Sequence, residues 1–96
     1  MDERIKKIAK HYGLISQVDK LSEESAEMIA AALQMCTKQN DRNNRDLLRN
    51  YLSELADVDI VLEQVKFLLT PNMRSYFDDV KEEKIIRTLK RIGAEQ

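Results

Sequence analysis

The sequence predicts an all-α protein, an antiparallel bundle of about four helices in one domain covering residues 1–96. The 96-residue chain has only two glycines and one proline, so it holds few residues that break helices. Strong helix formers dominate the rest, above all Leu, Ala, Glu, Lys and Arg. Apolar residues recur at steps of three and four, the spacing of one helix face. Short connections between such helices favour antiparallel neighbours.

The first helix is expected over residues 2–12. Ile5, Ile8 and Ala9 share one side of it. Gly13 follows directly, and glycine commonly ends a helix because it adopts positive φ angles without strain. A second helix is therefore expected to begin close behind the first.

The second helix is expected over residues 14–38. Its start is open, because Asp19 or Ser22 could serve as an N-cap and begin the helix later. Its apolar stripe repeats at helical spacing through Val18, Leu21, Ser25, Met28, Ile29, Ala32 and Cys36.

The segment QNDRNNRD, residues 39–46, is polar and rich in asparagine, which predicts a loop. The third helix is expected over residues 46–69, and it is the most apolar of the four. At 100° per residue, its apolar side chains form an arc too wide for one neighbour in a small bundle. The arc contains Leu47, Leu48, Tyr51, Leu55, Val58, Val61, Leu62, Val65, Leu68 and Leu69.

The fourth helix is expected over residues 71–92. Thr70 is placed as its N-cap, with Pro71 at the first helical position, where a missing N–H group costs nothing. Gly93 is placed as the residue that ends it.

Two helices carry acidic pairs beside apolar residues. In the third helix, Glu54 falls inside the apolar arc and Asp57 at its edge, one turn further along. In the second helix, Glu24 and Glu27 have the same spacing, while Glu23 points further toward solvent. If the two helices pack side by side, four carboxylates converge.

Converging carboxylates are unfavourable unless a cation neutralises them, because burial penalises the charged form. Oxygen ligands favour a hard metal such as Mg²⁺ or Mn²⁺. No histidine follows either pair at the Glu-x-x-His spacing of a di-iron bundle. The simpler interpretation is that these glutamates are good helix formers on a solvated face.

The acidic pairs also form a longer pattern, EExxE followed by ExxD. The first motif covers residues 23–27, the second covers residues 54–57, and 26 residues separate them. This pattern resembles that of the MazG-like members of the all-α nucleoside triphosphate pyrophosphohydrolases. The resemblance covers about residues 13–92, and the segment EEKIIRTLKRI, residues 82–92, is similar to the closing helix of small family members.

The resemblance implies hydrolysis of nucleoside triphosphates to monophosphate and pyrophosphate. It implies that Glu24, Glu27, Glu54 and Asp57 hold Mg²⁺, with Mn²⁺ as a substitute. Glu23, with Glu24, would have a catalytic role, orienting the attacking water or acting in the outer shell. Metal ions can neutralise the triphosphate and activate water, so no Ser, Cys or His nucleophile is required.

Basic and amide side chains would complete the substrate site. Lys84 and Arg87 belong to a row of basic residues along the fourth helix and lie in the family-like segment, so they are the candidates for phosphate contacts. Gln17 and Lys20, just before the first motif, are further candidates for base or phosphate contacts. The alternative for the basic row is a solvated face with internal ion pairs.

Composition limits the remaining classes. A net charge of −1 argues against a general nucleic-acid binder, and no apolar run is long enough to cross a membrane. A single cysteine excludes an intrachain disulfide, and residues 1–13 lack the apolar segment of a secretory signal, so a cytoplasmic protein is expected. The wide apolar arc predicts a homodimer at least. The resemblance to the MazG-like enzymes implies a dimer or a tetramer.

Three functional hypotheses follow. The first is a Mg²⁺-dependent nucleotide pyrophosphohydrolase. The second is a non-catalytic helical oligomerisation or interaction module that retains the fold. The third is a small regulator that binds nucleic acid through the basic row of the fourth helix, which the near-neutral charge disfavours.

Overall fold

The computed structural model describes residues 1–37 and 44–94, and the described chain consists of four α-helices with no strand. They are α1 (Glu3–Tyr12), α2 (Leu14–Thr37), α3 (Asn44–Leu68) and α4 (Pro71–Arg91). This confirms the all-α prediction. The helix α3 begins two residues earlier than expected, so only residues 39–43 of the predicted loop are left, and these lie outside the described residues.

The boundary between α1 and α2 is formed by Gly13. Its φ of +86° turns the chain, and its N–H donates a hydrogen bond of 2.8 Å to the carbonyl of Ala9. At the other end of α1, the Asp2 carboxylate accepts a 2.8 Å hydrogen bond from the N–H of Arg4. These two caps fix α1 as a short helix directly before α2.

The late start considered for α2 is wrong. Asp19 and Ser22 both lie inside the helix, which already begins at Leu14. The Ser22 hydroxyl donates to the carbonyl of Val18, one turn earlier, and so does not cap a helix start. Gly13 also accepts from the N–H of Gln17, so α2 begins as soon as the chain has turned.

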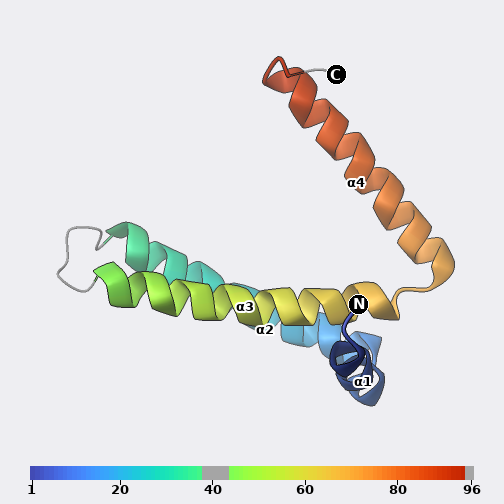
Figure 1. Cartoon of the computed structure of the whole chain (residues 1–96), viewed down its shortest axis with the longest axis horizontal. Coiled ribbons are helices and arrows are strands. Elements are labelled where there is room, and N and C mark those ends of the chain that lie inside the picture. The colour runs from blue at the N-terminus through green and yellow to red at the C-terminus, as the bar shows by residue number, and fades with distance from the viewer. Residues whose placement is uncertain (38–43, 95–96) are drawn as a thin grey trace.

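The helices α2 and α3 run antiparallel and pack along their length, and α1 packs across one end of this hairpin (Figure 1). At that end, the ammonium groups of Lys6 and Lys10 each lie 5.8 Å from the centroid of the Phe67 ring. A buried hydrogen bond from the Gln17 amide to the Gln64 side-chain carbonyl joins α2 to α3. The two lysine contacts hold α1 against α3, and the glutamine hydrogen bond holds the N-terminal part of α2 against α3.

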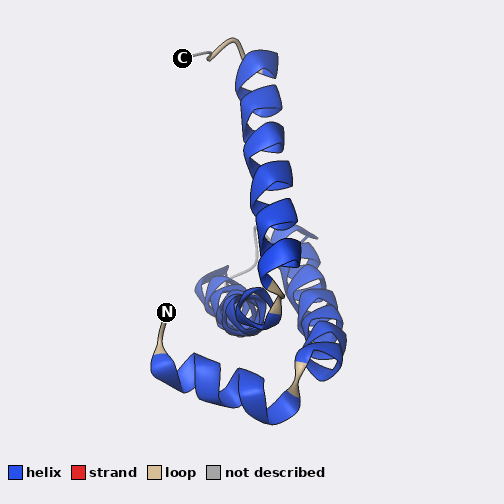
Figure 2. Ribbon diagram, turned by 90° about the vertical axis from the view of Figure 1, so that its right-hand side faces the viewer, coloured by secondary structure: helices blue, strands red, loops and turns tan. Residues whose placement is uncertain are grey.

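The fourth helix extends away from the hairpin (Figures 1 and 2). The Thr70 hydroxyl caps it by accepting from the N–H of Met73 at 3.3 Å, and Pro71 occupies its first position, as predicted. The φ of +72° at Gly93 follows its end. Within one chain, α4 therefore does not join the other helices, and the four-helix antiparallel bundle expected from the sequence is reduced to α1, α2 and α3.

The core within one chain is small. The buried apolar residues among those described are Ala9, Ala31 and Val61. No large side chain in the described part of the chain is fully buried. No described helix has the length and hydropathy needed to cross a membrane.

Candidate metal centre

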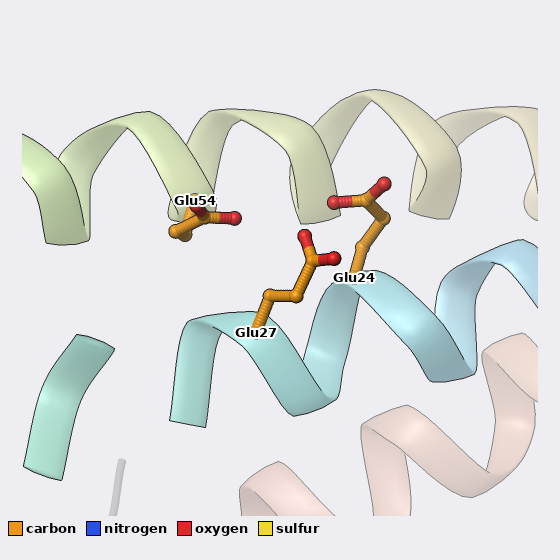
Figure 3. A group of neighbouring side chains, drawn as sticks. All are labelled: Glu24, Glu27 and Glu54. Carbon is orange, nitrogen blue, oxygen red and sulfur yellow. The ribbon is translucent and has the colours of Figure 1, made fainter. Parts of the chain in front are cut away.

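Three glutamates meet in the middle of the α2–α3 hairpin. Glu24 and Glu27 lie one turn apart on α2, and Glu54 projects from α3 toward them (Figure 3). One carboxylate oxygen from each can be chosen so that all three atoms lie within 4.8 Å of one another. We call these three residues the carboxylate cluster. The predicted convergence of the two motifs is thus present for three of the four proposed ligands.

Asp57 does not belong to the carboxylate cluster. It is absent from the group whose ligand oxygens lie within 4.8 Å of one another. Its side chain is exposed, as is that of Glu27, whereas Glu54 is half-buried and Glu24 is buried. Three residues after Glu54, a helical side chain is rotated by about 60°, which takes Asp57 from the hairpin contact toward solvent. The sequence places both acids on one side of α3, but only the structure separates their surroundings.

Two oxygens of the carboxylate cluster are enclosed without a partner. Oε2 of Glu24 and Oε2 of Glu54 are inaccessible to solvent and have no hydrogen-bond partner among the described residues. The Glu24 residue retains only 8% of its surface exposure. An enclosed polar atom without a partner costs roughly 1–3 kcal/mol, and more when it is charged. Such atoms are rare in native proteins, and a water molecule, a metal ion or a proton would each satisfy them.

Lys20 forms an ion pair with the carboxylate cluster. Its Nζ lies 3.1 Å from Oε1 of Glu24 and 3.7 Å from Oε2 of Glu23. The hydrogen bond and the charge of Glu24 raise the pKa of Lys20 above its ordinary value, so the ammonium stays charged. Glu23 lies outside the cluster and is exposed, as predicted.

One ammonium does not balance the carboxylate cluster. The negative charge of Glu24, followed by that of Glu54, raises the pKa of Glu27 above its ordinary value. A further positive charge beside the cluster would relieve this repulsion.

A divalent cation fits these residues. In an octahedral Mg²⁺ site, oxygens lie about 2.1 Å from the ion, so opposite ligands are up to about 4.2 Å apart. The 4.8 Å limit on the carboxylate cluster is only slightly wider, and small side-chain rotations would close the difference. A donor set of oxygen atoms alone favours Mg²⁺ or Mn²⁺ over softer metals. Glu24 Oε2 and Glu54 Oε2 are the oxygens left free to bind it.

A groove begins beside Lys20 and continues between α1, α2 and α3, with a volume of about 430 Å³. Gln17 lines it, so the structure places Gln17 and Lys20 on the same side of the site. Gln64 also lines the groove, and sequence analysis missed it. The available signal was its position on α3, three residues after Val61 and four before Leu68, which puts an amide on the packed side of the helix.

Lys84 and Arg87 are exposed on α4, which extends away from the hairpin (Figure 1). Within one chain, the structure does not bring them to the carboxylate cluster. No family model, curated protein or solved structure matches the chain. The geometry of the site must therefore carry the functional interpretation.

Proposed function

We propose that this protein is a metal-dependent nucleoside triphosphate pyrophosphohydrolase, similar to the MazG-like enzymes. The observation that carries the proposal is the pair of enclosed oxygens, Glu24 Oε2 and Glu54 Oε2, facing the third carboxylate of Glu27. The EExxE and ExxD motifs that supply these residues are the motifs that resemble the family. The proposed substrate is an NTP or dNTP, and the proposed products are nucleoside monophosphate and pyrophosphate.

In this proposal, Glu24, Glu27 and Glu54 hold Mg²⁺, or Mn²⁺ in its place. A bound divalent cation would neutralise phosphate charge and lower the pKa of a water molecule. Asp57 is assigned to the outer edge of the site, where its exposed carboxylate could bind through water. This is a smaller role than the sequence motif implies.

Lys20 and Glu23 have complementary roles beside the metal ligands. The Lys20 ammonium lies between the cluster and the groove, where it can contact a phosphate oxygen as well as Glu24. Glu23 is exposed and can accept a hydrogen bond from a water molecule, which fits a group that orients the nucleophile. Gln17 lies in the same groove and is assigned to contacts with the remainder of the nucleotide.

Lys84 and Arg87 can contact the phosphates only if α4 from a neighbouring chain reaches the site. We therefore propose that the enzyme is a homodimer or tetramer, in which α4 finds its packing partner outside its own chain. The small core within one chain supports this assembly. With a nucleotide substrate and a single cysteine, we place the protein in the cytoplasm.

The test is a panel of NTPs and dNTPs with monophosphate and pyrophosphate both quantified. We expect the two products in equal amounts, only with Mg²⁺ or Mn²⁺, and no turnover in Glu54→Gln. The matched control is Glu82→Gln, which changes an exposed glutamate on α4 and should retain activity. If no nucleotide is cleaved with Mg²⁺ or Mn²⁺, the enzymatic proposal fails. The non-catalytic helical module then takes its place, and it predicts no stabilisation by the metal.

A further inference from the structure

A single chain exposes more surface than a compact protein of its mass. Its accessible surface is 7611 Å² for 11.2 kDa, whereas a compact monomer of that mass exposes about 5,700 Å². Its radius of gyration is 16.8 Å, compared with about 12.5 Å for a compact domain of this length. The excess of roughly 1,900 Å² exceeds the ~800 Å² that each partner contributes to a standard interface.

Part of this surface is a heptad repeat on α3. Its leucines begin at Leu48 and follow at steps of four, three and seven residues, and all are at least 38% exposed. Asp59 divides the last step of seven into four and three, so the spacing is a regular alternation of four and three residues. This alternation is the a/d pattern of helices that pack in a coiled coil. The positions are Leu48, Leu52, Leu55, Asp59 and Leu62.

The helix α2 carries a second repeat with the same spacing. Ile15, Ile29 and Leu33 are its large members and are 83%, 55% and 60% exposed. Asp19, Ser22 and Ala26 occupy the positions between them and are also exposed. The small side chains of Ser22 and Ala26 let a neighbouring helix approach closely. Asp19 is the charged position of this repeat, as Asp59 is on α3. We call the two repeats together the hairpin seam.

Both halves of the hairpin seam lie on one side of the hairpin. At 100° per residue, each repeat lies about 120° around its helix from the side that packs on the other helix, and the rotation has the same sense in α2 and in α3. Because α2 and α3 run antiparallel, two equal rotations in the same sense bring both repeats to the same face of the hairpin. Glu27 and Asp57 are rotated the opposite way. The seam and the open side of the carboxylate cluster therefore lie on opposite faces.

We propose that the hairpin seam binds the hairpin seam of a second copy of this chain, forming an interface of four helices. The binding partner is a second copy of the chain, because a heptad repeat on two antiparallel helices packs best against another such pair of helices. A two-fold contact of this kind is closed and uses the same surface on both partners. Asp59, in an otherwise leucine-rich row, restricts the register, as single polar residues at such positions do.

The helix α4 also carries exposed apolar residues, on more than one side. Met73, Phe77 and Val80 lie on one side and Ile86 and Leu89 nearly opposite. Between these sides lies Ile85, which lines an apolar groove of about 620 Å³ along α4 together with Phe77 and Leu89. The hairpin seam is longer than this groove and runs over two helices, so we assign the two-fold contact to the seam.

The inference names a two-fold surface for the proposed homo-oligomer and does not depend on nucleotide hydrolysis. Because the seam faces away from the open side of the carboxylate cluster, α4 of a neighbouring chain would reach the cluster through a second contact, as in a tetramer.

The test is sedimentation of the full chain over a range of concentrations. We expect a dimer for the unmodified protein and a dissociation constant at least about 100-fold weaker for Leu52→Glu/Leu55→Glu, because the two charges would be buried. The matched control is Ile60→Glu, an exposed apolar residue of α3 that lies off the seam and should leave the dimer intact. A dimer that survives the double substitution unchanged overturns the seam while leaving the oligomer proposal standing.

A second measurement uses the unmodified protein, in case the double variant does not fold. Hydroxyl-radical labelling should modify Leu52, Leu55 and Leu33 much less than their exposure in a single chain implies, while Ile60 is labelled freely. Strong labelling of all four residues at a concentration where the protein is dimeric overturns the proposal. A protein that is monomeric at every concentration overturns both the seam and the oligomer, while the nucleotide panel still tests hydrolysis.

Discussion

We predict that Glu54→Gln is more stable than the wild type without metal and less stable than the wild type when Mg²⁺ is added. Glu54→Gln keeps the side-chain shape and removes one negative charge from the carboxylate cluster. Without metal, the wild type bears the repulsion between Glu24 and Glu54 and the cost of two enclosed oxygens without partners. The variant should therefore be more stable than the wild type in EDTA.

The expected size follows from the geometry. Two unit charges 4.8 Å apart repel by about 0.9 kcal/mol in bulk water and about 3.5 kcal/mol at an effective dielectric constant of 20. We expect Glu54→Gln to gain about 1–3 kcal/mol in EDTA, which corresponds to roughly 4–8 °C per kcal/mol for a domain of this size. With Mg²⁺ at a hundred times its dissociation constant, the wild type gains about 2.7 kcal/mol, which the variant lacks.

Thermal unfolding followed by circular dichroism measures both effects at one fixed protein concentration. Each protein is melted in EDTA and in a series of Mg²⁺ concentrations, with Glu82→Gln as the control for loss of an exposed charge. The curves of wild type and Glu54→Gln should cross as Mg²⁺ increases. The reasoning is refuted if Glu54→Gln is destabilised in EDTA and its melting temperature still rises with Mg²⁺ as in the wild type.

Three further predictions concern residues around the site and the first helix. Asp57→Asn should weaken Mg²⁺ binding by less than about tenfold in a calorimetric titration, because Asp57 lies outside the carboxylate cluster; a loss as complete as in Glu54→Gln would restore it as a direct ligand. Gln64→Leu should lower the free energy of unfolding in urea by about 1–3 kcal/mol, because it leaves the buried Gln17 amide without its acceptor. The double variant Gln17→Leu/Gln64→Leu should lose less than the sum of the two single changes, and strict additivity would show that the amides act independently. The Arg4 side chain lowers the pKa of Asp2 from 3.8 to about 2, so its stabilisation is present above pH 3.8 and is lost as the pH falls toward 2. Asp2→Asn should remove this part of the acid sensitivity, which melts between pH 5 and pH 2 would detect as a flatter profile.

The helices were largely predictable because their signals are local. Gly13, Thr70 and Pro71 act through the conformation of one or two residues, and the structure places the predicted boundaries beside them. The start of α2 was ambiguous because Asp19 and Ser22 are good N-cap types. The packing of that helix on α3 from its first turns overrides this preference, and such packing is a tertiary effect.

The carboxylate cluster was predictable in part for the same reason. Spacing within one helix places Glu24 and Glu27 on neighbouring turns, and the apolar surroundings of Glu54 predict that it faces a partner helix. Which face of α3 meets α2 depends on how both helices rotate when they pack. That rotation turns Asp57 outward, and the spacing of residues within one helix does not determine the rotation.

The direction of α4 was the least predictable feature. The sequence predicts that the chain turns at Pro71, but it does not predict the direction of the helix that follows. A short turn favours packing against the preceding helix, and the expected four-helix bundle followed from that preference. The apolar residues of α4 lie on two different sides of the helix, so no single stripe holds it against α3.

Titration with Mn²⁺, followed by electron paramagnetic resonance of the free ion, tests the central claim most directly. It detects a metal site whether or not the right nucleotide has been chosen, and Mn²⁺ binds to the same oxygen ligands as Mg²⁺. We predict saturable binding to the wild type, competition by Mg²⁺, and loss of that binding in Glu54→Gln but not in Glu82→Gln. Binding that is equal in all three proteins, or absent from the wild type, would contradict the account.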